Sequence, residues 1–169
     1  GKVVSRQTGK SAGGLVGENR DTVINSYSKA QVQSQGVRAG GLAGWNRGGT
    51  INNSYATGNV NGTERIGGAV GYNSYANVNR IHATGNVTGT KDVGGLIGRN
   101  TEAETKESYA TGDVNGGEVL GGLVGWNQNS NITNTYATGD VNGDNYVGGL
   151  VNYNWKGSRI EKSFATGNV

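Results

Sequence analysis

The chain contains no cysteine, proline or methionine, and its only histidine is His82. The absence of cysteine excludes disulfide bonds, thiol nucleophiles and Cys-ligated zinc. A single histidine excludes His-rich metal sites and leaves a Ser/His/Asp triad only one possible base. No apolar run approaches the length of about 18 residues that a membrane-spanning helix needs, so we expect no membrane span in this segment.

Charge is also scarce, since 16% of the residues are charged and the formal net charge is +3. Lysine and arginine are scattered, so we expect no nucleic acid among the partners. The absence of proline fits a chain whose backbone N–H groups are all needed for strand pairing.

Glycine, by contrast, accounts for 33 of the 169 residues. Collagen would require glycine at every third position together with abundant proline, and neither is present. The glycines follow a period of 27 residues instead, because Gly13-Gly14 recurs at 40–41, 67–68, 94–95, 121–122 and 148–149.

A second block of sequence follows each glycine pair, for example Asn-Ser-Tyr-Ala-Thr-Gly-Asn-Val at 53–60. The repeated blocks are rich in residues that favour strands, and no window has a helical period. A unit of 27 residues cannot bury its own apolar face, whereas stacked copies can. The sequence therefore predicts an all-β fold: a right- or left-handed parallel β-solenoid (β-helix) of about six 27-residue coils.

We expect residues 1–169 to form a single β-solenoid repeat domain that is a slice of a longer repeat array. Neither end carries a distinct unit that would protect an open sheet edge. Flanking repeats or domains of the same protein are therefore expected partners. The pairs Asn61-Gly62, Asn115-Gly116 and Asn142-Gly143 predict tight turns, because Asn and Gly both tolerate positive φ.

In-register stacking places equivalent residues in columns along the solenoid. One column consists of asparagine in every unit: Asn19, Asn46, Asn73, Asn100, Asn127 and Asn154. We interpret it as a structural ladder in which side-chain amides hydrogen-bond from coil to coil at a turn. The invariant glycine columns indicate turns or places where two walls approach closely.

Strand alternation assigns the two faces of the second block. Ser54, Ala56, Gly58 and Val60 share one face and are predicted to point inward. The opposite assignment would bury rows of Thr and Asn or Asp. The outward residues form a candidate binding face: Tyr55, Thr57, Asn59, Thr84, Asn86, Tyr109, Thr111, Asp113, Tyr136, Thr138 and Asp140.

The glycine-pair block is apolar at both alternating positions. One column on the same strand face as Val70 varies from Glu18 to Trp45 to Arg99, and such variability indicates solvent exposure. That face is therefore predicted to point outward. This assignment puts the column of Leu42 in the core. It leaves the column of Val70 as a modest apolar stripe on the outer face, which a neighbouring segment or chain can cover.

These blocks resemble the GLUG motif of bacterial surface proteins, named for a Gly-Leu-any-Gly core. That core is present at 14–17, 41–44, 95–98 and 122–125, whereas Ala69 and Asn152 depart from it in two other units. The motif is typical of large secreted adhesins and of exported regions of IgA-specific metallopeptidases. The resemblance implies an extracellular or bacterial cell-surface module without catalytic residues, so we expect no enzyme activity and no cofactor.

Two functions follow from these observations. An aromatic column beside hydroxyl and amide groups suits polysaccharide or a host or matrix protein as the ligand of an adhesin. Alternatively, identical residues stack only to stabilise the sheets, as in a passive stalk or exported scaffold. An ice-binding solenoid is a remote alternative. Ice-binding faces usually pair two threonine columns, whereas this sequence has one threonine column between the aromatic column and the column of Asn or Asp.

Asp113 and Asp140 occupy one column in adjacent coils, so their backbones should lie about 4.8 Å apart. Paired carboxylates at such a distance suit a retaining glycosidase or a weak Ca²⁺ site. However, Asn59 and Asn86 hold the same column, so the acid is not required there. We interpret His82 as a replacement for tyrosine in the aromatic column.

Overall fold

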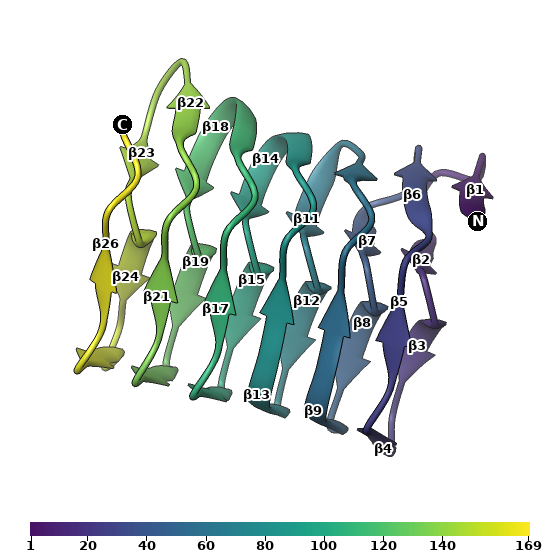
Figure 1. The fold of residues 1–169 in the computed structure, drawn as a ribbon, viewed down its shortest axis with the longest axis horizontal. Helices are drawn as coiled ribbons and strands as arrows, with labels where there is room; N and C mark the ends of the chain where they lie inside the picture. Colours follow the sequence, from purple (N-terminus) through teal and green to yellow (C-terminus); the bar gives the residue numbers. More distant parts are fainter.

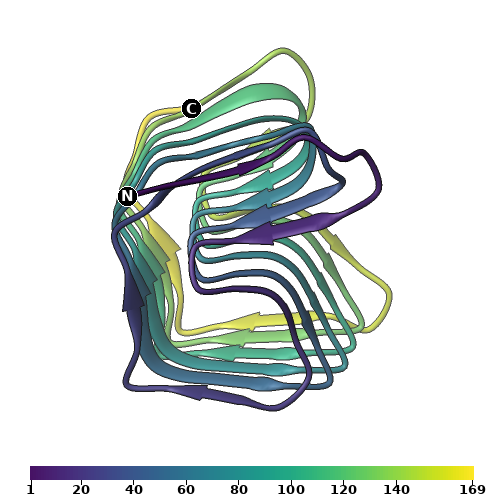
Figure 2. The same ribbon diagram turned by 90° about the vertical axis from the view of Figure 1, so that its right-hand side faces the viewer.

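The computed structural model describes residues 1–169 and contains twenty-six β-strands and no helix. The strands pair in parallel within three sheets, and the chain passes through all three in every coil (Figure 1). Sheet B contributes one strand to each of six coils. The predicted parallel β-solenoid is therefore confirmed. Seen from the N-terminal end, the chain runs clockwise as it recedes, which makes the solenoid right-handed (Figure 2).

Sheets A and C each contain ten strands, and sheet B contains six. Sheet A consists of β1 (Lys2–Ser5), β2 (Ser11–Gly13), β6 (Gln31–Ser34), β7 (Arg38–Gly40), β10 (Val60–Asn61), β11 (Glu64–Gly67), β14 (Val87–Gly94), β18 (Val114–Gly121), β22 (Val141–Gly143) and β23 (Val147–Gly148). Sheet B consists of β3 (Val16–Asn19), β8 (Ala43–Arg47), β12 (Val70–Ser74), β15 (Ile97–Thr101), β19 (Val124–Gln128) and β24 (Val151–Trp155). Sheet C consists of β4 (Thr22–Ile24), β5 (Tyr27–Ser28), β9 (Thr50–Ala56), β13 (Asn77–Ala83), β16 (Glu104–Lys106), β17 (Tyr109–Ala110), β20 (Asn131–Thr133), β21 (Tyr136–Ala137), β25 (Arg159–Glu161) and β26 (Phe164–Ala165).

The register between coils does not slip along the sheets. In sheet B, Val70 lies between its equivalents Ala43 and Ile97. Differences in coil length are absorbed at the corner between sheets B and C, where Gly48 and Gly157 take positive φ values of 71° and 76°, and in the segments of sheet A between β1 and β2 and between β6 and β7. Within the paired strands each residue therefore meets its own equivalent above and below.

Each coil encloses two separate apolar cores. The larger core contains the columns of Leu42, Val70 and Ile81, and the smaller core contains those of Val60 and Ile66. Between them, the second glycine of each pair packs against the alanine of the Tyr-Ala-Thr-Gly block. A Cβ atom on Gly95 would lie 3.0 Å from the Ala110 Cβ and 2.1 Å from the Gly122 carbonyl oxygen. Only glycine allows the two walls to meet at this point.

The expectation of an outer apolar stripe is wrong, because Val70, Ile97 and Val124 are fully buried. The chain bends after Gly67, between β11 and β12, and strand alternation does not carry through the bend. The residue at the bend and the first residue of the next strand consequently both face the larger core. Ile66 precedes the bend and lines the smaller core instead.

The turns predicted at the Asn-Gly pairs are also wrong. Asn115-Gly116 lies inside β18, and no residue of the three pairs has positive φ. Left-handed corners occur instead at residues of varied type, among them Arg80 (50°), Glu107 (47°) and Val119 (54°). The glycines of the pairs are needed for space, since a Cβ atom on Gly62 would lie 2.5 Å from Ile66 Cδ1 in the smaller core.

Candidate binding surfaces

The candidate binding face lies on the outside of sheet C and continues over the adjoining corner. Strand alternation assigns it correctly: Ala56, Gly58 and Val60 are buried, whereas Thr57 and Asn59 are exposed. The structure brings the predicted residues together as three neighbouring columns, namely an aromatic column, a threonine column and a column of Asn or Asp, which we call the Asx column.

The aromatic column is a continuous stack of six rings. Its members are Tyr27, Tyr55, His82, Tyr109, Tyr136 and Phe164. Neighbouring ring centroids lie 4.8 to 5.3 Å apart, and the ring planes are within 8° of parallel. Each internal ring is therefore covered on both faces by its neighbours. The column presents ring edges and hydroxyl groups to solvent, and its internal rings offer no free face to a sugar.

His82 occupies the tyrosine position of this stack, between Tyr55 and Tyr109. Burial lowers the pKa of its imidazole, which favours the neutral form. Burial also raises the pKa of the Tyr109 hydroxyl, and the neighbouring Tyr136 raises it further. Both shifts favour the uncharged forms of these two rings.

The Asx column has a structural role that its composition alone did not reveal. Asn59 Oδ1 accepts the backbone N–H of Asn86 at 2.9 Å, and Asn86 Oδ1 accepts that of Asp113 at 3.0 Å. The series continues from Asp113 to Asp140 at 3.0 Å and from Asp140 to Asn168 at 2.8 Å. Because each bond uses only an Oδ1 acceptor, Asn and Asp serve equally well. This explains why both Asn and Asp occur in the column.

Asp113 and Asp140 therefore already use one carboxylate oxygen each to satisfy a backbone donor. No group of three or more His, Cys, Asp or Glu side chains is arranged to hold a metal ion. The mixture of Asn and Asp in the column follows from the backbone bonds and requires neither a metal nor a catalytic pair. A Ca²⁺ site at these two residues stays a prediction.

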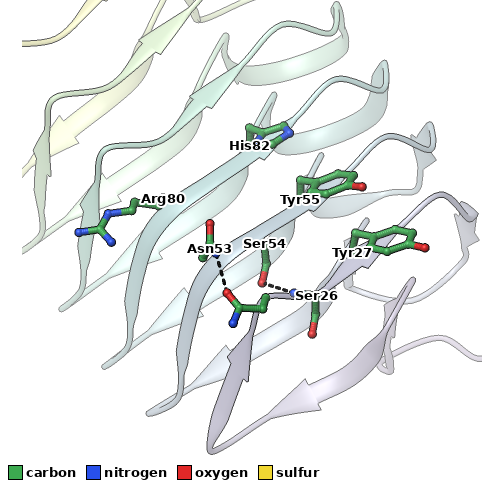
Figure 3. Close-up of a pocket in the computed structure, with 8 residues that line it drawn as sticks. Ser26, Tyr27, Asn53, Ser54, Tyr55, Arg80 and His82 are labelled. Atoms are coloured by element: carbon green, nitrogen blue, oxygen red, sulfur yellow. Dashed lines mark hydrogen bonds between the residues drawn. The ribbon is translucent and has the colours of Figure 1, made fainter.

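The threonine column is the most accessible part of the face. Thr84, Thr111 and Thr138 are exposed, and their hydroxyl groups make no hydrogen bond within the protein. Beside the aromatic column, a shallow hollow is lined by eight residues (Figure 3). Asn25, Asn53 and Arg80 are among its lining residues, and Asn53 Nδ2 donates to Asn25 Oδ1 at 2.5 Å. The hollow is open to solvent and mixes polar side chains with the apolar parts of the aromatic rings.

The six asparagines interpreted as a ladder lie stacked along sheet B. Nδ2 of each donates to Oδ1 of the next over 2.8 to 2.9 Å. The same Nδ2 atoms also donate to backbone carbonyls at the following corner, as Asn127 does to Ser130 at 3.1 Å. The four internal members are fully buried. Both ends of each amide are used, so the column belongs to the framework of the solenoid.

A second, half-buried surface was missed by the sequence interpretation. It is a groove between sheets A and B, which we call the Arg-aromatic groove, defined by Arg38, Trp45, Arg65, Tyr72 and Arg99. These residues come from two columns whose members differ from coil to coil, so no repeated motif marks them. The available signal was that the column of Trp45 and Tyr72 carries a long side chain in every unit.

The fold and its columns define a parallel β-solenoid built from stacked repeats. A scan against protein-family models matches the GLUG motif at residues 35–61, 89–115 and 116–142. These three segments therefore carry the GLUG motif, as the resemblance indicated. A comparison with curated proteins finds no significant match. No helix of the structure is long and apolar enough to cross a membrane.

Proposed function

We propose that this chain is a non-catalytic repeat module of a bacterial cell-surface or secreted adhesin. In this role the solenoid is a rigid rod that mediates attachment to glycans or to host and matrix surfaces. The observation that carries the proposal is the candidate binding face, where free threonine hydroxyls repeat at one per coil beside the aromatic edges. Such an array suits a ligand that is itself extended and repetitive.

Rigidity follows from the way the coils are joined. The three parallel sheets, the buried amide ladder and the ring stack all bind each coil to the next. In a repeat protein, stability arises largely from such contacts between neighbouring units. The face would therefore present its groups to a ligand with little loss of conformational entropy.

One observation favours the alternative of a passive stalk or exported scaffold, such as a region of an IgA-type metallopeptidase. The ring faces and the Oδ1 atoms of the Asx column are already occupied by neighbouring coils. Two of the three columns thus have a structural use that needs no ligand. The threonine column distinguishes the two functions, because its hydroxyls have no partner within the protein.

The test is binding of the chain to a panel of glycans and extracellular-matrix proteins. The variant Thr111→Lys/Thr138→Lys obstructs the face and leaves every backbone hydrogen bond in place. Its matched control is Thr88→Lys/Thr90→Lys, which adds the same charge at exposed positions of sheet A. Binding that only the first variant abolishes supports the adhesin. No binding by the wild-type chain to any member of the panel supports the stalk.

A further inference from the structure

The backbone of each coil is indented between sheets A and B (Figure 2), and at this indentation Arg38 and Arg65 of sheet A lie over the rings of Trp45 and Tyr72 of sheet B. The strands of sheet A that precede the glycine pair form one wall, and sheet B forms the other. They touch at the last glycine of the GLUG core, because a Cβ atom on Gly71 would lie 2.6 Å from the Ala39 nitrogen and 2.7 Å from the Arg65 carbonyl oxygen. Beyond this contact the walls diverge, and a hollow opens at Lys10, Glu18 and Arg38.

Aromatic rings and guanidinium groups line the groove in alternation. The rings of Trp45 and Tyr72 stack with centroids 5.9 Å apart. The guanidinium of Arg38 lies 4.3 Å from the Trp45 ring, and that of Arg65 lies 5.4 Å from the Tyr72 ring. Farther along, Arg99 lies 4.9 Å from the Trp126 ring. Stacking on a ring holds each guanidinium in place. Both terminal nitrogens of Arg99 already bind Asp92 and Gln128, whereas Nη1 of Arg38 and Nη1 of Arg65 make no hydrogen bond within the protein.

The carboxylates of Glu18, Glu64 and Asp92 lie near the arginines in the N-terminal half of the groove. Arg38 nevertheless forms no ion pair; its Nε donates to the hydroxyl of Ser11 and its Nη2 to the carbonyl of Gly9. Burial lowers the pKa of Arg38, and the nearby charge of Arg65 lowers it further. Arg65 contacts Glu64 through one terminal nitrogen at 2.9 Å, while its buried Nε has no partner. A bound anion would relieve the repulsion between these two arginines.

Resting on the proposed attachment to glycans, we propose that this groove binds an acidic polysaccharide. The chain would lie parallel to the solenoid axis, with uronate carboxylates held by Arg38 and Arg65. A planar guanidinium binds a planar carboxylate through two parallel hydrogen bonds. The two arginines occupy equivalent positions in consecutive coils, so they recur at a step of about 4.8 Å.

The length of the step distinguishes the class of polymer. An extended peptide advances about 3.3 Å per residue, so its acidic side chains fall out of register with the coils. A pyranose unit is about as long as one coil step, so successive sugars meet successive coils. Register thus favours a uronate polymer over an acidic peptide of similar charge.

The experiment measures the affinity of the whole chain for polygalacturonate, neutral dextran, dextran sulfate and poly-glutamate. We expect polygalacturonate to bind most tightly. The variant Arg38→Gln/Arg65→Gln should weaken that binding roughly tenfold or more, since each lost charge-assisted bond removes a sizeable share of the affinity. The control Lys106→Gln/Lys162→Gln removes the same charge from the other side of the solenoid and should leave binding unchanged.

The variant Arg38→Lys/Arg65→Lys retains the charge without the planar fork, and it guards against failure of the glutamine variant to fold. Circular dichroism checks both folds. Binding that the lysine variant weakens and the control does not supports the proposal. Stronger binding of dextran sulfate or poly-glutamate than of polygalacturonate overturns it, as does equal binding by both arginine variants and the wild type. In that last case glycan attachment itself stands. Absence of binding to all four polymers overturns the proposal for this groove, whereas the adhesin proposal is decided separately by the panel of glycans and matrix proteins.

Discussion

Two columns of the solenoid carry side-chain oxygen acceptors, and their sequences differ sharply. The buried ladder contains asparagine in all six coils, from Asn19 to Asn154. The exposed Asx column contains asparagine at Asn59 and Asn86 but aspartate at Asp113 and Asp140. In the ladder each amide both donates and accepts between coils. In the Asx column the bond to the backbone of the next coil uses only Oδ1, and Asn59 and Asn86 are exposed to solvent.

This difference shows that the residue types found in a column depend on how many hydrogen bonds the side chain must make. A buried atom without a partner costs about 1–3 kcal/mol, whereas an exposed one is satisfied by water. Asparagine is therefore obligatory inside and interchangeable with aspartate outside.

The largest expected effect is that of Asn100→Asp in the ladder. The new carboxylate would be buried and could not donate to Asn127 Oδ1, now at 2.9 Å. An uncompensated buried charge costs about 3–5 kcal/mol of unfolding free energy, which urea denaturation measures. The same substitution outside, Asn59→Asp, should be nearly neutral. Equal losses from both variants would break the comparison.

Gly95→Ala extends the comparison to the contact between the two walls. Its Cβ would lie 2.1 Å from the Gly122 carbonyl oxygen, and overpacking of this kind costs about 1–3 kcal/mol. Gly149 holds the same column in the last coil, where a Cβ would meet nothing closer than 3.4 Å. Thermal unfolding should show a lowered midpoint for Gly95→Ala and an unchanged one for Gly149→Ala. A comparable loss in both variants would refute the close-approach explanation.

Removal of an acceptor from the exposed column should have a smaller effect. Asp113→Ala deprives the backbone N–H of Asp140 of its partner, and loss of one such bond costs about 1 kcal/mol. Asp113→Asn retains Oδ1 and should match the wild type in urea denaturation. If the asparagine variant lost as much stability as the alanine variant, charge rather than hydrogen bonding would govern the column.

The smallest expected effect is the pH dependence of stability that the buried Asp92 causes. This residue is fully buried, its Oδ2 lies 3.4 Å from Nη1 of Arg99, and its Oδ1 has no partner. Burial raises the pKa of its carboxyl, although Arg99 and Lys91 oppose the shift. The folded state therefore binds the proton more readily, and this residue's contribution to stability falls as the pH rises from the ordinary aspartate value through the raised pKa.

The variant Asp92→Asn lacks this titration. Its unfolding free energy relative to the wild type should be most favourable at neutral pH and should decline toward about pH 4, near the ordinary pKa of aspartate. Urea denaturation at several pH values measures the difference. A relative stability that instead grows on acidification would show that Arg99 stabilises the ionised carboxylate.

The sequence predicts the fold class and the inward face of the second block because both follow from periodicity. Ser54, Ala56 and Val60 alternate with Tyr55 and Thr57 along one strand, so a single choice of face assigns all of them. The choice fails at Gly67-Gly68, where the chain bends and the period of two is interrupted. Nothing local shows that Val70 and Leu42 enter the same core.

The candidate sites show the same division. The columns of Tyr55, Thr57 and Asn59 could be identified in advance, since stacking brings equivalent residues together. The covering of each ring face by the neighbouring ring depends on side-chain orientation, so it could not be identified in advance. The Arg-aromatic groove joins Arg38 to Trp45 across two sheets, and such a pairing leaves no periodic mark.

The sequence by itself determined the 27-residue period, the parallel stacking and the residue composition of each column. These follow from contacts between equivalent positions, which a repeat displays directly. Only the tertiary structure decided where each coil bends, that it encloses two cores, and which columns line a groove. Those features depend on how closely the walls of one coil approach across its interior, and steric fit between residues distant in the chain sets that approach.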